Sequence, residues 1–214
     1  KMEAAQCTLY SGGLKGAETV FGETAEKYSV NEVVFTFEGH KLSRQKNVRV
    51  LSKEDLERGD ISMELASKML NRTYYETEKI RKVLQTIFHM VNSGYQVFVI
   101  GSIQEDDSVK GGTGWAVQLA KMFNRPLHVF DQPSGKWFTW GEGWQEDAPR
   151  IQYETFVGSG TRYLNDAGKT ATVASAFSIN PDATSLVWAD QLFNQAVGLM
   201  HPTFAVKLIF NNVD

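Results

Sequence analysis

Two glycine-rich segments constrain this chain more than any other feature of its sequence. The first spans residues 10–18 and the second spans residues 110–118. Each follows a short apolar run and precedes a helical pattern, which is how a parallel α/β sheet presents free backbone N–H groups at the N-terminus of a helix. Two such turns in one domain predict a ligand that carries a phosphate, such as a nucleotide.

The chain around these segments alternates between predicted strands and helices. Apolar runs predict strands at 7–11, 31–37, 96–100 and 126–131, and apolar periodicity predicts helices at 16–28, at 73–91 and after the second glycine segment. Ser52 is a predicted N-cap, and helical spacing continues through Ile61, Leu65 and Met69, with Gly59 as a point where this stretch could divide into two helices. This order predicts a doubly wound, mostly parallel α/β sheet with both glycine turns at the carboxyl ends of strands.

The alternation of predicted parallel strands and helices becomes less regular toward the C-terminal part of the chain, and it changes after residue 149. Residues 136–140 alternate between apolar and polar and predict an edge or hairpin strand. Beyond them we expect a strand with a glycine turn at 155–162, a helix at 184–200 and a last strand at 204–210. The sequence therefore predicts a nucleotide-binding domain over residues 1–150 and a C-terminal annex over residues 151–214 that packs on it.

Composition narrows the class of protein. The net charge of −3 argues against a nucleic-acid partner, since such proteins usually carry a basic stripe. No apolar run is long enough to span a bilayer, the N-terminus lacks the apolar core of a signal peptide, and the single cysteine excludes an internal disulfide. We therefore expect a cytoplasmic protein. Asp106 and Asp107 lack a histidine partner, so no metal site is expected.

At these residues the chain resembles the SLOG superfamily of Rossmann-like proteins. This group includes the LOG-type cytokinin-activating phosphoribohydrolases, the molybdenum-cofactor carrier proteins and the Rossmann core of DNA-processing protein A. The resemblance covers about residues 5–140 and rests on the turns at 11–18 and 111–114; it extends most closely to uncharacterised phage and bacterial members. It implies a Rossmann-like fold, a nucleotide or other phosphate-bearing ligand with no certain cofactor, and a homodimer.

One departure from the LOG pattern bears on catalysis. The LOG signature Pro-Gly-Gly-x-Gly-Thr-x-x-Glu ends in a glutamate, and Gln118 falls at that position here. An amide cannot act as a carboxylate base or stabilise an oxocarbenium ion by charge. The departure favours a sensor, carrier or sequestering protein. Two alternatives stay open: a phosphoribohydrolase that cleaves the N-glycosidic bond of a nucleoside monophosphate, with Glu18 or Gln118 as weak catalytic candidates, and a DNA-binding protein like DNA-processing protein A.

The candidate ligand contacts come from both turns and from a later arginine. Backbone amides, hydroxyls and cations that could hold a phosphate are Ser11, Gly12, Gly13, Gly16, Lys110, Gly111, Gly112, Thr113, Gly114 and Arg162. His40, after the second predicted strand, is a candidate base or ribose contact or else a surface histidine. Trp115 is a candidate for base stacking or else a core residue. Glu18 either caps the first helix or accepts hydrogen bonds from a ribose.

Overall fold

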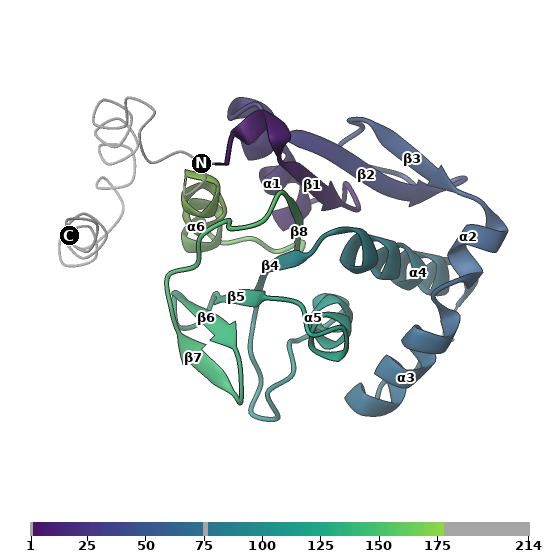
Figure 1. Ribbon diagram of the computed structural model, residues 1–214. Coiled ribbons are helices and arrows are strands. Elements are labelled where there is room, and N and C mark those ends of the chain that lie inside the picture. The colour runs from purple at the N-terminus through teal and green to yellow at the C-terminus, as the bar shows by residue number, and fades with distance from the viewer. Residues whose placement is uncertain (1, 75–76, 178–214) are drawn as a thin grey trace, which may run out of the picture. The chain divides into compact units, whose positions relative to one another are not determined.

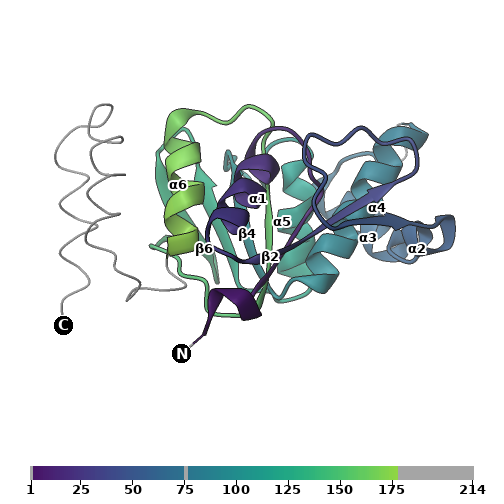
Figure 2. The same ribbon diagram turned by 90° about the horizontal axis from the view of Figure 1, so that it is seen from above.

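A computed structural model describes residues 2–74 and 77–177 of the chain (Figures 1 and 2). These residues form an eight-stranded sheet in the order β3–β2–β1–β8–β4–β5–β6–β7, with helices on both faces. Every neighbouring pair is parallel except β5–β6 and β6–β7, which are antiparallel. The prediction of a Rossmann-like, doubly wound α/β fold is therefore confirmed.

The strands and helices follow the predicted order closely in the first 140 residues. The strands are β1 (Thr8–Ser11), β2 (Asn31–Phe37), β3 (Val48–Leu51), β4 (Gln96–Gly101), β5 (Leu127–Asp131), β6 (Lys136–Trp140), β7 (Trp144–Glu146) and β8 (Thr155–Gly160). The helices are the short 3-10 helix η1 (Ala4–Gln6), α1 (Ala17–Lys27), α2 (Lys53–Glu57), α3 (Asp60–Leu70), α4 (Glu78–Ser93), α5 (Thr113–Met122) and α6 (Asp166–Phe177). The hairpin strand predicted at 136–140 is β6.

Two helix starts show how local chemistry sets these bounds. The Ser52 hydroxyl accepts a hydrogen bond from the backbone N–H of Asp55 at 3.1 Å, which confirms the predicted N-cap of α2. Helix α4 begins at Glu78 rather than at residue 73, because the hydroxyl of Thr77 accepts from the backbone N–H of Ile80 and caps the helix there. No helix in the described part of the chain is long and apolar enough to cross a membrane.

The strand at 155–160 corrects the predicted domain boundary. Strand β8 lies at the centre of the sheet, between β1 and β4, where Val157 is paired with Tyr10 on one side and with Val97 on the other. Helix α6 then packs on α1. The expectation of a separate annex from residue 151 is therefore wrong for residues 151–177, which complete the main domain. The helix predicted at 184–200 and the strand predicted at 204–210 lie outside the described residues.

The two faces of the sheet have separate cores. Helices α1 and α6 lie on one face of the sheet (Figure 2). Phe21 of α1 packs there with Leu9 and Phe156 of the sheet. Helices α2, α3, α4 and α5 lie on the other face, where the larger core includes Met90 and Leu119. Because the parallel strands are buried on both sides, their apolar runs are nearly continuous.

Candidate functional site

The glycine turns meet at the carboxyl edge of the sheet, but with a third turn between them. The first turn follows β1 and the second follows β4, and the exit of β8 lies between these two strands. The backbone N–H of Thr161 donates to the carbonyl of Ile100 at 2.9 Å, and the N–H of Ala17 donates to the carbonyl of Thr161 at 3.0 Å. After β1 the chain adds β2 and β3 on one side of β8, and after β4 it adds β5, β6 and β7 on the other side. Open α/β sheets bind ligands at such points, where the strand order changes direction.

The first glycine turn is occupied by the protein's own carboxylate. Glu18 is 5% exposed, and its Oε2 accepts from the backbone N–H of Leu14 at 3.0 Å while its Oε1 accepts from the Ser159 hydroxyl at 3.1 Å. A Cβ at Gly12 would lie 2.9 Å from the same Oε2. Burial raises the pKa of Glu18, and the hydrogen bonds from Leu14 and Ser159 oppose that rise. A carboxyl group of the protein therefore sits where the sequence predicted a phosphate.

The other residues of this turn serve internal packing as well. Ser11 is fully buried, and its hydroxyl accepts from the backbone N–H of Gly13 at 3.3 Å. Gly13 has φ +64°, and its carbonyl accepts from the N–H groups of Ser43 and Arg44. Gly16 has φ +98°, and a Cβ there would run into the backbone of residues 161–162. The expectation that Ser11, Gly12, Gly13 and Gly16 face a ligand phosphate is not supported, because contacts within the chain account for each of them.

The second glycine turn is open. The backbone N–H groups of Gly111, Gly112 and Thr113 donate no hydrogen bond within the described residues. Gly111 has φ +71°, which favours glycine, and a Cβ at Gly114 would collide with the carbonyl of Val109 and with Arg72. Gly112 differs from both, because it has an ordinary helical φ of −60° and a Cβ there would meet nothing within 4 Å. Within the two turns, Gly112 is the glycine that no contact in the described chain explains.

Arg72 fixes the loop that leads into this turn. Its Nη1 donates to the carbonyl of Gly111 at 2.9 Å, and its Nη2 donates to the carbonyl of Val109 at 3.0 Å. The same Nη2 also contacts Ser108 and Gln104. A planar guanidinium can hold several acceptors at once in this way. Arg72 stands alone after a helix and belongs to no recognisable motif, so no sequence pattern marks it as a site residue.

Two exposed cations, Arg162 and Lys110, lie at this edge. In the described part of the chain, neither Arg162 nor Lys110 forms an ion pair, and both residues are exposed. The carboxylate of Asp131 is engaged internally, since it accepts from the backbone N–H groups of Ile103 at 2.9 Å and Ser134 at 3.0 Å. An anion that arrives here meets two cations that no carboxylate contacts at ion-pair distance, although the charge of Arg162 also acts on the nearby Glu18 and lowers its pKa.

His40 follows β2 and lies near the cations Lys79 and Arg162. Its ring stacks on Phe37 with centroids 4.5 Å apart, and its Nδ1 lies 3.2 Å from the Thr36 hydroxyl oxygen. Partial burial lowers the pKa of His40, and the charges of Lys79 and Arg162 lower it further. The ring is therefore neutral at pH 7, when it can both donate and accept a hydrogen bond.

The candidate base contact Trp115 and the candidate catalytic residue Gln118 are both buried. Trp115 is 4% exposed and packs against the ring of Tyr74 at 5.9 Å, so of its two predicted roles, base stacking or core residue, the structure supports the core residue. Gln118 is also buried, and its Nε2 contacts the Met69 sulfur of α3 at 3.4 Å. That contact turns its side-chain amide toward α3. Among the described residues, no group of three or more His, Cys, Asp or Glu side chains is placed to hold a metal ion.

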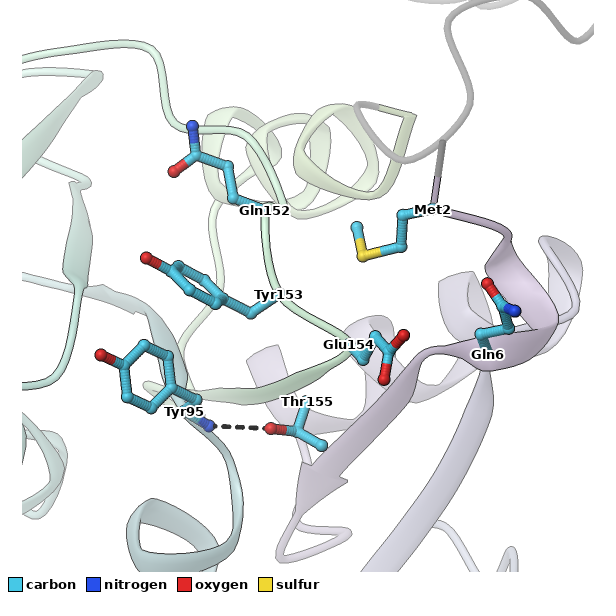
Figure 3. Close-up of a pocket in the computed structure, with 7 residues that line it drawn as sticks. All are labelled: Met2, Gln6, Tyr95, Gln152, Tyr153, Glu154 and Thr155. Atoms are coloured by element: carbon cyan, nitrogen blue, oxygen red, sulfur yellow. Dashed lines mark hydrogen bonds between the residues drawn. The ribbon is translucent and has the colours of Figure 1, made fainter.

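A pocket of about 580 Å³ lies at the opposite, amino edge of the sheet (Figure 3). Tyr95 and Tyr153 line it with their rings 4.6 Å apart in an edge-on arrangement. The other lining residues are Met2, Gln6, Gln152, Glu154 and Thr155. None of the lining residues is a lysine or arginine, so the chemistry that would hold an anion is at the carboxyl edge and not in this pocket.

Comparisons with known proteins add no identification. No protein-family model, no curated protein and no solved structure matches the chain. The resemblance to the SLOG superfamily stays a prediction from the residues at 11–18 and 111–114.

Proposed function

We propose that this protein binds a phosphate-bearing small molecule, of the nucleotide or nucleoside-phosphate class, at the carboxyl edge of its sheet. The phosphate binds the open N-terminus of α5 at Gly111, Gly112 and Thr113, and the rest of the ligand extends across the exit of β8 toward Arg162 and His40. The protein acts as a sensor, carrier or sequestering protein, and it holds the ligand without converting it.

The observation that carries this proposal is the unexplained glycine at 112. Glycine lets a ligand approach the backbone closely, and the three amides at 111–113 have no partner in the described chain. The helix dipole of α5 adds a positive field at the same place. A phosphate at this position satisfies the free amides and accounts for the missing side chain.

The closed first turn decides which of the two glycine turns holds the phosphate. Because the Glu18 carboxyl group already fills the turn after β1 and accepts the hydrogen bonds that this turn offers, it leaves no place there for a second phosphate. Arg162 lies beside that turn and Lys110 precedes the open one, so both cations flank the proposed path of the ligand. A ligand with one phosphate group, bound at α5, fits this arrangement better than one with phosphates at both turns.

Gly112→Ala tests the phosphate position directly. The backbone at Gly112 suits any residue and the space is open, so the variant should fold with unchanged or slightly greater stability, by about 0.5 kcal/mol. The added methyl group blocks close approach of the phosphate, and we expect AMP to bind at least about tenfold more weakly by isothermal titration calorimetry. Gly141→Ala is the matched control, since a Cβ at Gly141 also meets nothing within 4 Å.

Two results would contradict the proposal. One is the absence of binding when the wild-type chain is titrated with the monophosphates of adenosine, guanosine, cytidine and uridine and with inorganic phosphate. The other is binding that Gly112→Ala leaves unchanged. Release of free base during the titration would instead identify a phosphoribohydrolase. Native mass spectrometry of the protein purified from cells would show the mass of any ligand that remains bound.

A further inference from the structure

The loop that joins β8 to α6 presents an aromatic ring to solvent beside the carboxyl edge of the sheet (Figure 1). Tyr163 is 88% exposed, more than any other large apolar or aromatic residue that the structure describes. The next residue, Leu164, is partly buried and packs against the core beneath α1 and α6. The loop therefore turns its leucine inward and leaves the tyrosine ring outside.

The backbone of Tyr163 is fixed on both sides. Its N–H donates to the Thr161 hydroxyl at 3.1 Å, and its carbonyl accepts from Nε2 of Gln132 at 3.2 Å. The Oε1 of Gln132 also accepts from the N–H of Asn165 at 2.9 Å. A tyrosine on a fixed backbone has only two side-chain torsions left to order, so a ligand that binds its ring costs little conformational entropy.

Backbone hydrogen bonds connect this loop to the open glycine turn. The N–H of Gln132 donates to the carbonyl of Gly101, the last residue of β4, at 2.9 Å. The carbonyl of Ser102 accepts from the N–H of Lys110 at 3.0 Å, and Lys110 directly precedes the open amides. Both segments are therefore anchored at the end of β4, so Tyr163 lies at a point of the carboxyl edge that neighbours the open turn.

We propose that Tyr163 stacks on the base of the bound nucleotide. The inference rests on the proposed function, in which the phosphate binds at Gly112 and the rest of the ligand extends toward Arg162, the residue before Tyr163. An aromatic ring binds a nucleobase through its face, and every base offers such a face. The ring therefore selects a nucleotide over a sugar phosphate, and it does not select one particular base.

The other two rings considered for base contact are less available. Trp115 is buried, and one face of His40 is covered by Phe37 at a centroid distance of 4.5 Å. The ring of Tyr163 has no stacking or cation contact within the described residues. It is therefore the ring at this edge on which a base stacks without displacing a side chain of the described chain.

A comparison of two ligands separates the base from the phosphate. Titration calorimetry on the whole chain measures the binding of AMP and of ribose 5-phosphate, which lacks the base. Wild type should bind AMP at least about tenfold more tightly than ribose 5-phosphate. Tyr163→Ser should lower the affinity for AMP by about that factor and leave the affinity for ribose 5-phosphate unchanged. Tyr163→Phe keeps the ring and should bind both ligands like wild type.

Tyr153→Ser is the matched control, because Tyr153 is an exposed tyrosine at the opposite, amino edge of the sheet. It should bind both ligands like wild type. Because the side chain of Tyr163 is so exposed, Tyr163→Ser should melt at the temperature of wild type. An equal melting temperature assigns any loss of AMP binding to the missing ring and not to unfolding.

The inference is overturned if Tyr163→Ser binds AMP like wild type, or if it weakens AMP and ribose 5-phosphate equally. Gly112→Ala distinguishes this failure from a failure of the proposed function, because the phosphate contact is common to both ligands and its loss should weaken both. If Gly112→Ala weakens both ligands and Tyr163→Ser weakens neither, the phosphate site stands and the stacking role of Tyr163 is wrong. A wild type that binds neither ligand contradicts the proposed function and this inference together.

Discussion

The side-chain nitrogen of Gln96 lies 2.9 Å from Nε2 of His128, inside the sheet domain. The Gln96 amide is oriented by the backbone, because its oxygen accepts from the N–H of Gln152 and its nitrogen also donates to the carbonyl of Arg150. A donor therefore faces Nε2 of His128, which must accept, while Nδ1 lies 2.8 Å from the Thr139 hydroxyl. Protonation of His128 at Nε2 would place its N–H against the N–H of the Gln96 amide, and two donors repel each other. The site holds a neutral histidine.

This arrangement predicts a loss of stability in weak acid. Burial lowers the pKa of His128 from 6.5 to about 4. Between those two values the unfolded chain takes up a proton at this residue and the folded chain does not, so the free energy of unfolding falls as the pH drops from about 6.5 to about 4. The expected loss is up to about 3 kcal/mol, measured from urea unfolding curves at a series of pH values.

His128→Gln separates this residue from the other titrating groups. The variant has no group at position 128 that titrates, whereas carboxylates such as Glu26 and Asp60, whose pKa values are lowered, remain in both proteins. The stability of the variant should therefore vary less with pH than that of wild type between pH 6.5 and 4. Parallel stability curves for the two proteins would show that His128 does not titrate as the burial predicts.

The closed first turn predicts a chemical rescue. Glu18→Ala removes the carboxylate that accepts from Leu14 and Ser159 and leaves buried donors without a partner, which should cost about 3 kcal/mol. Acetate can occupy the vacated space as an anion of the same chemistry. We expect acetate to raise the melting temperature of this variant relative to chloride at equal ionic strength, with no such effect on wild type.

Glu23→Ala is the control for this rescue, because Glu23 is an exposed glutamate on the same helix. It should melt close to wild type and respond to acetate no more than wild type does. If Glu18→Ala were as stable as wild type, the carboxylate would not be an integral part of the turn, and the first glycine segment would again be a candidate for a ligand phosphate.

The central position of β8 predicts a strong effect of a single methyl group. A Cβ at Gly158 would lie 2.5 Å from Cγ of Phe21 and 2.9 Å from Cδ1 of Leu9, which is too close for the packed face beneath α1. Gly158→Ala should therefore lower the free energy of unfolding by about 1–3 kcal/mol, as measured by urea denaturation. Gly141→Ala adds the same methyl group in open space and should change stability little. Equal stability of the two variants would be inconsistent with the close packing of β8 against α1.

The sequence alone determined the parts of this protein that depend on neighbours along the chain. Apolar runs fixed β1, β2, β4 and β5, since a strand buried on both faces needs a continuous apolar segment. The polar hydroxyl of Ser52 fixed the start of α2 through a hydrogen bond to a residue three positions later. The glycine segments marked the two turns, because positive φ angles at residues such as Gly13 and Gly111 are a local property of the backbone.

Only the tertiary structure decided which of these features face each other. The sequence of residues 155–160 is compatible with a strand at the centre of the sheet and equally with a strand in an annex. Its pairing with β1 and β4 decides that it is a central strand. The contact between Glu18 and Ser159 joins residues 141 positions apart, so no local pattern predicts that the first turn is closed. The apolar period of Ile61, Leu65 and Met69 predicted a helix, yet those side chains are the exposed ones. The apolar period of a helix shows that one of its faces is apolar, and only long-range packing determines whether another element covers that face.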